Sequence, residues 1–220
     1  MKKYIITATG TEIGKTLITA ALAHQIRERG DEVAAIKPII SGYQVGKTND
    51  TEILIKAQGL RVNQKSIHNC SPWRFIAPIS ADVAARYQGQ QVNFDELAKF
   101  CNDTATNSRY LLIEGVGGVM SPLTNSETII DLIPRVKAGV LLVAGSYLGS
   151  ISHTLTAIAV LKAKGISNIK IVISESPENA MPIEETANSI ARFCDYEIMV
   201  VPRIEDGDYK SVPDITSLIL

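Results

Sequence analysis

The chain has 220 residues, of which 45% are hydrophobic and 20% are charged, a composition typical of a soluble globular protein. This balance excludes a disordered chain, and a domain of this length buries roughly 70% of the surface that its unfolded chain exposes. The chain has 22 basic and 23 acidic residues, which give a formal net charge of −1, and the sequence contains no run of Lys and Arg residues. Nucleic acid is therefore not an expected partner.

The cysteines and the apolar runs indicate the compartment. Cys70, Cys101 and Cys194 are odd in number and form no C-x-x-C pair, so neither a disulfide framework nor a zinc site is predicted. The apolar run after the basic pair at positions 2–3 is too short for a signal peptide, and Val140–Ala144 is too short for a membrane span. We expect a cytoplasmic protein that does not contact a membrane.

Short aliphatic runs alternate with helical patterns along the chain. Most of the runs lack a polar–apolar alternation, which is typical of parallel strands buried on both faces. Between them, residues 18–26, 151–161 and 183–193 repeat apolar side chains with helical spacing. The sequence predicts one α/β domain over residues 1–220, with a mainly parallel sheet and helices on both faces. The predicted strands are Tyr4–Thr7, Val33–Ile36, Tyr110–Ile113, Val140–Ala144, Ile169–Ile173 and Ile198–Val201.

Residues 59–95 have the least regular pattern. They contain Pro72 and Pro78, with one predicted helix near Ala81–Tyr87. We interpret this segment as an irregular insertion within the domain rather than as a second domain. The C-terminal Val212–Leu220 is expected to pack as a short last element.

The segment that follows the first predicted strand has the composition of a phosphate-binding loop, and positions 8–16 read A-T-G-T-E-I-G-K-T. Small residues let consecutive backbone N–H groups point at an anion, a lysine reaches the outer phosphates, and a hydroxyl binds Mg²⁺. Gly10, Gly14, Lys15 and Thr16 supply these groups, although Thr9 stands where the generic pattern G-x-x-x-x-G-K-[ST] has glycine. A strand-to-helix turn with a chance Gly-Lys-Thr is the alternative. The position at the carboxyl end of the first strand favours ATP or a related nucleotide.

Two further strands end in residues that suit phosphate chemistry. Val33–Ile36 leads into Lys37-Pro38, and Tyr110–Ile113 leads into Glu114, which is followed by three glycines in four residues. An acid at a strand end opposite a phosphate loop is how a Walker-B carboxylate reaches Mg²⁺. Taken singly, Lys37 has an alternative interpretation as a solvated surface lysine, and Glu114 has one as a helix-capping acid. Their position beside the phosphate loop favours the functional interpretation.

Two other positions leave both interpretations open. Asp50 precedes a predicted helix, Glu52–Ala57, where an acid is either a favourable cap or a metal ligand. Gly149-Ser150 leads into another predicted helix, whose first N–H groups would either hold an anion or be solvated.

With these motifs in view, the sequence resembles the dethiobiotin synthetase family nearly end to end. The resemblance rests on residues 11–16, 37–42, Asp50 and 114–118. That family's loop, G-T-x-T-x-V-G-K-T, is one residue longer than the generic one, which accounts for Thr9. The resemblance implies a P-loop NTPase-like fold and an ATP- and Mg²⁺-dependent cyclo-ligase of biotin biosynthesis.

The implied reaction converts 7,8-diaminononanoate and CO₂ or bicarbonate to the cyclic urea dethiobiotin. A carbamate forms on one amine, takes the γ-phosphoryl of ATP to become a carbamic-phosphoric anhydride, and is attacked by the second amine. Two lysines suit this path because negative charge accumulates between carbamate and γ-phosphate. The resemblance also implies a homodimer.

The family's functional residues carry over by position. Catalytic roles fall to Lys37, Lys15 and Thr11, and Thr16, Asp50 and Glu114 form the Mg²⁺ shell. The substrate is expected to contact Ser41, Thr11 and Lys37, together with Gly149, Ser150 and Ile151 of the other subunit. The nucleotide is expected to contact Glu12, Ile13, Gly14, Lys15, Thr16, Leu17, Asp50, Glu114, Gly115, Val116, Gly117, Ser174, Glu175, Pro202, Arg203 and Ile204.

At the base site the chain departs from the family it resembles. Where the family has an Asn-Asp pair after the fifth strand, this chain has Ser174-Glu175. A serine hydroxyl cannot present the two-point pattern of an asparagine amide, so we expect weaker selection for adenine.

A dimerising switch ATPase of the ParA/MinD type is the alternative function. Those proteins carry a signature lysine five residues before the lysine of the phosphate loop, and this chain has Gly10 there. The sequence also lacks the N-K-x-D motif of GTPases.

Overall fold

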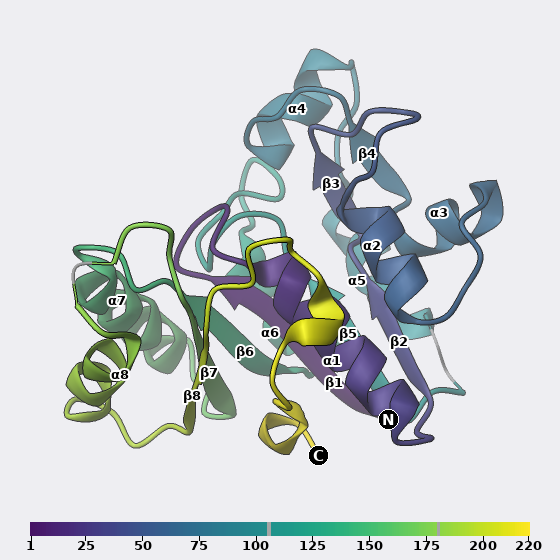
Figure 1. The fold of residues 1–220 in the computed structure, drawn as a ribbon. Helices are drawn as coiled ribbons and strands as arrows, with labels where there is room; N and C mark the ends of the chain where they lie inside the picture. Colours follow the sequence, from purple (N-terminus) through teal and green to yellow (C-terminus); the bar gives the residue numbers. More distant parts are fainter. Residues whose placement is uncertain (105–106, 180) are drawn as a thin grey trace.

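The computed structural model describes residues 1–104, 107–179 and 181–220. Within these residues, six parallel strands form one sheet in the order β2-β5-β1-β6-β7-β8 (Figure 1). Each expected strand is confirmed to within two residues. The strands are β1 (Lys2–Ala8), β2 (Val33–Ile36), β5 (Tyr110–Glu114), β6 (Gly139–Ala144), β7 (Ile169–Ser174) and β8 (Ile198–Val201).

Helices connect the strands, as the alternating pattern predicts. The helical patterns over residues 18–26, 151–161 and 183–193 correspond to α1, α7 and α8. The sequence did not single out α3, α5 and α6. The helices are α1 (Lys15–Glu28), α2 (Asp50–Ala57), α3 (Gln64–Cys70), α4 (Ala81–Tyr87), α5 (Phe94–Asp103), α6 (Ile129–Val136), α7 (Ser150–Ala163) and α8 (Ile183–Ala191), with the 3₁₀ turns η1 (Tyr209–Ser211) and η2 (Thr216–Leu218).

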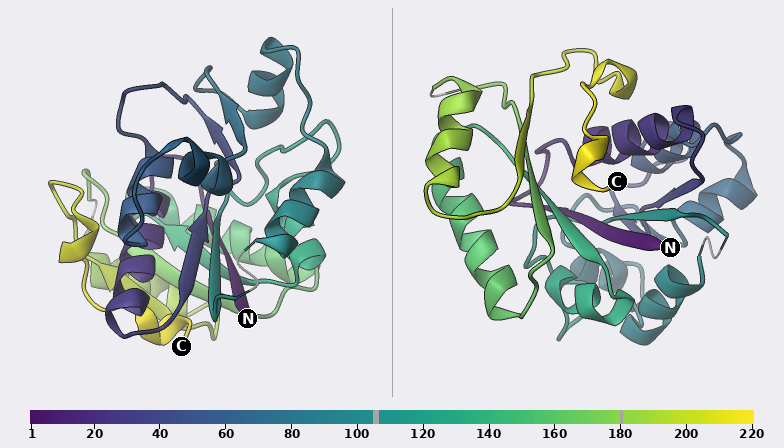
Figure 2. Two further views of the ribbon diagram at one scale, coloured as in Figure 1. Left: turned by 90° about the vertical axis from the view of Figure 1, so that its right-hand side faces the viewer. Right: turned by 90° about the horizontal axis from the view of Figure 1, so that it is seen from below.

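The two faces of the sheet bury separate hydrophobic clusters. Residues of α1, α2, α3 and the C-terminal segment pack on one face, and residues of α4 to α8 pack on the other (Figure 2). Successive side chains of β1 serve both clusters, with Ile5 on one face and Ile6 on the other. Burial on both faces is the physical reason that the strands read as unbroken aliphatic runs.

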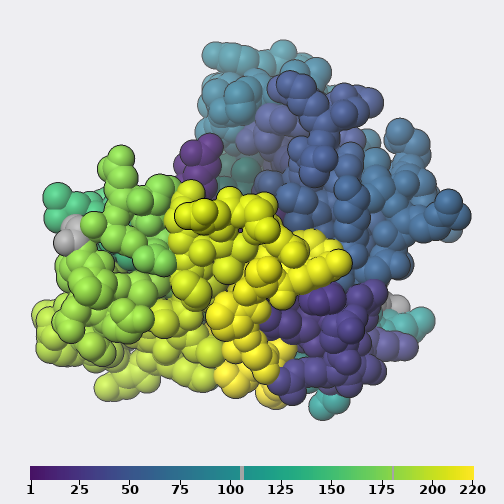
Figure 3. Space-filling model, in the orientation of Figure 1, coloured from purple at the N-terminus to yellow at the C-terminus, as the bar shows by residue number. Residues whose placement is uncertain are grey.

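The C-terminal segment packs against α1, as expected. Ile215 and Leu218 are buried, and the Gln25 side chain of α1 donates to the carbonyl of Val212 (3.0 Å) and accepts from the N–H of Ile215 (3.1 Å). Figure 3 shows this segment, in yellow, lying across the front of the molecule.

Residues 59–95 are more regular than the sequence suggested. Besides α4, which spans the expected residues, they contain α3 and a strand, β4 (Trp73–Phe75). This strand pairs in parallel with β3 (Ile39–Ser41) to make a second, two-stranded sheet. Phe75 is fully buried in the main core, which joins this part of the chain to the large sheet.

All three cysteines are free thiols. Burial raises the pKa of Cys70 to about 11 and that of Cys101 to about 12, so these two thiols are unreactive in the folded protein. Among the described residues, no helix is long and apolar enough to cross a membrane.

The edge strand β2 is closed by a side chain instead of a neighbouring strand. The Gln58 side chain accepts a hydrogen bond from the N–H of Ala35 and donates one to its C=O, both at 2.9 Å. An open edge exposes unpaired backbone groups that can recruit another chain. Gln58 satisfies such a pair at a buried position.

We predict that Gln58→Ala lowers the free energy of unfolding by about 1–3 kcal/mol, because it leaves a buried donor and a buried acceptor unpaired. Gln58→Glu should also lose stability, since its second carboxylate oxygen would face the carbonyls of Ala35 and Leu54, to which the amide donates. Urea unfolding measures both, with the exposed Gln90→Ala as the control. Equal stability of Gln58→Ala and Gln90→Ala would show that the edge needs no such closure.

Candidate functional site

The phosphate loop joins β1 to α1 and depends on glycine at its end. Gly14 caps α1 in the left-handed region, with φ at 92°. A Cβ at this position would lie 2.8 Å from the Ser174 hydroxyl, so both the backbone and the neighbouring strand favour glycine. The first turn of α1 contains no acidic residue, which leaves its N–H groups and positive dipole end available to an anion.

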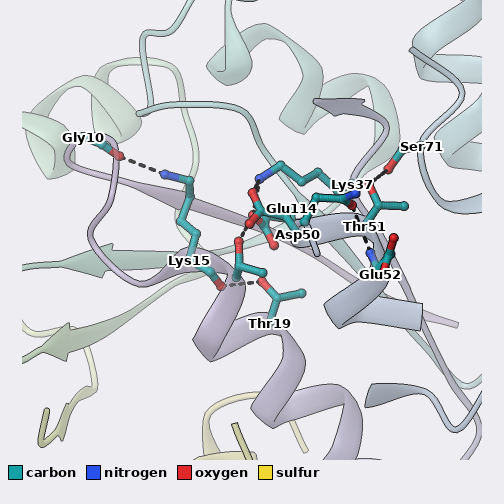
Figure 4. A network of polar contacts seen from close by, with 11 residues as sticks. Gly10, Lys15, Thr19, Lys37, Asp50, Thr51, Glu52, Ser71 and Glu114 are labelled. Carbon is teal, nitrogen blue, oxygen red and sulfur yellow. Dashed lines mark hydrogen bonds and ion pairs between the residues drawn. The ribbon is translucent and has the colours of Figure 1, made fainter. Parts of the chain in front are cut away.

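Lys15 lies at the start of α1 and folds back along the loop. Its ammonium donates to the carbonyl of Gly10 at 2.9 Å (Figure 4). Burial lowers the pKa of Lys15 to about 8, against a partial offset from the carboxylate of Glu114. Burial therefore makes the charged form of Lys15 less stable in the folded protein. A buried lysine of this kind is typical of a site that binds an anion.

Lys37 is buried directly after β2 and pairs with two acids. Its ammonium lies 2.8 Å from Oε1 of Glu114 and also bonds the carboxylate of Asp50 (Figure 4). Burial alone would lower the pKa of Lys37, but the carboxylates of Glu114 and Asp50 outweigh it and hold that pKa above its ordinary value. Lys37 is thus a fixed cation and not a solvated surface lysine.

Asp50 differs from the expectation in its place on the helix. The helix predicted at Glu52–Ala57 begins two residues earlier, so Asp50 is its first residue instead of preceding it. The side chain of Asn49 caps α2 by accepting from the N–H of Glu52 at 3.2 Å. Because Asn49 serves as the cap, the carboxylate of Asp50 is free to bond Lys37.

Glu114 ends β5 and connects the two lysine-bearing regions. Its Oε1 accepts from the Thr16 hydroxyl at 2.7 Å as well as from Lys37. Its Oε2 is buried and has no hydrogen-bond partner among the described residues. A buried orphan carboxylate oxygen beside a hydroxyl is a strong cation-binding feature, since such an oxygen is costly to leave unpaired.

The oxygens of Thr16, Asp50 and Glu114 fit a hard cation such as Mg²⁺. In the described part of the chain, no three His, Cys, Asp or Glu side chains gather as a metal cage. Mg²⁺ is commonly held by one or two carboxylates together with substrate phosphates and water. The residues present therefore suit a cation that arrives with a polyphosphate.

A cavity of about 630 Å³ opens beside the phosphate loop, between the segments that follow β1, β7 and β8. It brings together eight of the expected nucleotide-binding residues with the phosphate-loop residues Gly10 and Thr11. The expected residues are Glu12, Ile13, Gly14, Leu17, Ser174, Glu175, Arg203 and Ile204. The sequence analysis missed Tyr147, Ser176, Pro177 and Glu178, which also line the cavity. Their position just after β6 and β7 was the signal that could have found them.

A second cavity of about 590 Å³ lies on the other side of the loop. Gly10 and Thr11 line both cavities and form the wall between them. The segment 118–122 and one side of α7, including His153 and Thr156, complete the second cavity. The exposed Thr11 is thus positioned to touch two ligands at once.

The remaining predicted residues lie outside the described lining of both cavities. Gly115, Val116 and Gly117 follow Glu114 and pack near the start of the loop, where the N–H of Gly115 donates to Ile6 at 2.9 Å. Pro202 precedes the lining residues Arg203 and Ile204. Ser41 ends β3 in the small sheet, and Gly149, Ser150 and Ile151 form the start of α7.

Comparison with known proteins identifies the family. A model described as an AAA domain matches residues 2–209. The ATP-dependent dethiobiotin synthetase BioD of Acidiphilium cryptum is 41% identical over 87% of this chain and 88% of its own length. That of Methylobacterium nodulans is 39% identical over 92% of this chain and 94% of its own. The chain belongs to the dethiobiotin synthetase family.

Solved structures agree on the P-loop NTPase fold of this dethiobiotin synthetase family member. A chain of the MinC:MinD cell division protein complex of Aquifex aeolicus superimposes with a TM-score of 0.60 at 14% sequence identity, and the match covers 96% of this chain and 85% of that one. A ParA family ATPase from Chlorobium tepidum superimposes with a TM-score of 0.58 at 15% sequence identity. The match covers 93% of this chain and 86% of that one. Identities this low establish the fold alone.

The two lysines should respond in opposite ways to removal of their charge. Lys37→Met leaves the buried carboxylate of Glu114 uncompensated, and we expect it to lower the free energy of unfolding by about 3–5 kcal/mol. Lys15→Met removes a charge that burial disfavours, so its stability should match or exceed that of the wild type. Urea unfolding at pH 7 measures both.

The double variant Lys37→Met/Glu114→Gln provides the control. It should recover part of the loss because the unpaired carboxylate is neutralised. If Lys37→Met and Lys15→Met had the same free energy of unfolding, the ion pair between Lys37 and Glu114 would not be a stabilising contact.

Proposed function

We propose that the chain is an ATP- and Mg²⁺-dependent dethiobiotin synthetase that closes 7,8-diaminononanoate and CO₂ into a cyclic urea. The observation that carries this proposal is the convergence of Lys37, Asp50, Glu114 and Thr16 at the phosphate loop. Family membership supports it independently. The cytoplasm, as inferred from the free cysteines, remains the expected compartment.

The nucleotide is proposed to bind on the side of the larger cavity. Its phosphates would lie over the first turn of α1, where unpaired N–H groups and the helix dipole favour an anion. Lys15 would exchange the Gly10 carbonyl for the β- and γ-phosphates, which restores the charge that burial weakens. The base would occupy the end lined by Ser174, Arg203 and Ile204.

Mg²⁺ is proposed to be held by Thr16, Asp50 and Glu114. When bound, it neutralises charge on the β- and γ-phosphates and aligns the transferring phosphoryl group. The orphan Oε2 of Glu114 would gain a partner from this cation.

The diamine is proposed to bind on the far side of the Gly10-Thr11 wall. Its carbamate, formed when an amine adds to CO₂ and loses a proton, would face Lys37 and the Thr11 hydroxyl. The carbamate oxygen then takes the γ-phosphoryl group, and ADP leaves. The second amine attacks the activated carbonyl, loses a proton, and expels phosphate as the ring closes.

Lys37 is suited to the developing charge because it stays protonated throughout. Carbamate, transferring phosphoryl and released phosphate are all anionic, and a preorganised cation stabilises each without a proton transfer of its own. Lys37 also bonds the two proposed metal ligands, so its position follows theirs.

We also propose that the active form is a homodimer, with Gly149, Ser150 and Ile151 of each subunit serving the substrate site of the other. Two features support this proposal. Helix α7 begins at Ser150 with no side-chain cap, and the neighbouring Leu148 is 85% exposed. A partner subunit that covered this position would remove the Leu148 side chain from water.

The activity should depend on both lysines. We predict that Lys15→Ala and Lys37→Gln each lower turnover at least 10²-fold, because each removes a cation that faces developing charge. ADP release is measured with and without 7,8-diaminononanoate and bicarbonate, after circular dichroism has confirmed that each variant is folded.

Two outcomes would contradict this function. Wild-type ATP turnover that ignores the diamine would favour a switch ATPase of the ParA/MinD type. A folded Lys37→Gln variant within threefold of the wild type would remove Lys37 from the reaction.

The dimer should depend on Leu148. We expect Leu148→Glu to shift the protein to monomers in sedimentation velocity and to lower activity with it, since a charge is costly to bury at an interface. Phe193→Glu is the matched control, because Phe193 is also exposed but follows α8, remote from the start of α7. A fully active monomeric wild type at assay concentration would overturn the dimer.

A further inference from the structure

The cavity proposed for the nucleotide base offers few free polar side-chain atoms. Several of its polar side chains are already bonded within the protein, so they have limited capacity to recognise a base. Which atoms remain free decides how strongly the cavity distinguishes adenine from other bases.

Glu175 has both carboxylate oxygens engaged. Oε1 accepts from the side-chain amide of Asn179 at 2.6 Å, and Oε2 accepts from the backbone N–H of Arg203 at 2.8 Å. The N–H of Glu175 itself donates to Val201 at 2.9 Å. Glu175 therefore fastens the segment after β7 to the segment after β8, and these bonds fix its carboxylate in place and use part of its acceptor capacity.

Two other lining side chains are engaged in the same way. The Ser176 hydroxyl accepts from the N–H of Ser146 at 3.0 Å, while the Ser146 hydroxyl accepts from the N–H of Ser176 at 2.9 Å. The Tyr147 hydroxyl bonds Nδ1 of His153 at 2.8 Å. The Ser146–Ser176 pair ties the segments after β6 and β7 together and uses part of the acceptor capacity of the Ser176 hydroxyl, while the Tyr147 bond ties the segment after β6 to α7.

Ser174 is the exception. Its side chain lies beside Gly14 at the start of α1, and the residue is 8% exposed. In the described part of the chain, its hydroxyl makes no hydrogen bond, so it is free to bond a base. Glu178 and Arg203 also line the cavity, but both are exposed, and water competes for their charges.

A lone hydroxyl discriminates weakly between bases. It rotates to donate or to accept, so it serves the 6-amino group of adenine, the 6-oxo group of guanine and the 4-amino group of cytosine alike. A side-chain amide, by contrast, presents a fixed donor–acceptor pair that favours one base edge.

We propose that Ser174 and the engaged Glu175 give this enzyme relaxed base selection, so that GTP and CTP replace ATP with less than a hundredfold loss in kcat/KM. This inference rests on the proposed function, since it concerns the nucleotide of the same reaction. It assigns to Ser174 the role of a specificity-determining residue that tolerates several bases.

The experiment measures binding and turnover separately. Isothermal titration calorimetry gives the affinities of the Mg²⁺ complexes of ATP, GTP and CTP, and phosphate release with diamine and bicarbonate gives kcat/KM. We expect the wild type to prefer ATP by less than a hundredfold in both. Ser174→Ala should weaken the binding of all three nucleotides alike, and Glu184→Gln, at an exposed position in the first turn of α8 outside the cavity, is the control.

A preference for ATP above a hundredfold in wild-type binding would overturn the inference, whether or not the diamine is turned over. A change of more than tenfold in the ATP-to-GTP ratio of Ser174→Ala would also overturn it, because the hydroxyl would then be a fixed discriminator. Absence of diamine-dependent phosphate release with every nucleotide would instead reject the proposed function.

Asn179→Ala tests the engagement of Glu175. This variant frees acceptor capacity on the Glu175 carboxylate, and because adenine, cytosine and guanine present their N–H donors at different edges, the ratio of the three affinities should change severalfold. An unchanged ratio would contradict the role given to Glu175.

Discussion

The carboxyl edge of the main sheet depends on one buried ammonium that bonds two carboxylates. Lys37, Asp50 and Glu114 come from the end of β2, the start of α2 and the end of β5, and their ion pairs fasten these three elements together. Each buried charge is tolerated only because the others compensate it. The arrangement of the site is therefore also a condition for the stability of this edge of the sheet.

Local signals made the sheet and the phosphate loop predictable from the sequence. Unbroken aliphatic runs identify strands buried on both faces, and the loop is recognisable from glycine, lysine and threonine in consecutive order. Helix α6 was missed because it contains Pro134, which normally argues against a helix. The start of α2 was misplaced because Asn49 and Asp50 are both good first-turn residues, and only the contact with Lys37 separates their roles.

Long-range contacts set the limit of prediction at the base site. The sequence identified Ser174, Glu175, Arg203 and Ile204, and the cavity brings all four together. It could not reveal that Asn179 and the backbone of Arg203 bond the carboxylate of Glu175, because Arg203 comes from a separate loop and the contact with Asn179 depends on how the segment after β7 folds back. Which atoms are left for a ligand is a property of the folded arrangement and not of composition.

The central position of β1 has a consequence for biosynthesis. This strand is made before both of its neighbours, since Lys2 pairs with Tyr110 and Tyr4 with Gly139, which follow more than 100 residues later. Until then the aliphatic strand has no sheet to join, and contacts between such distant segments form slowly. The phosphate loop is therefore anchored only when segments far along the chain complete the sheet around β1, and until then the aliphatic strand exposes apolar surface and unpaired backbone groups.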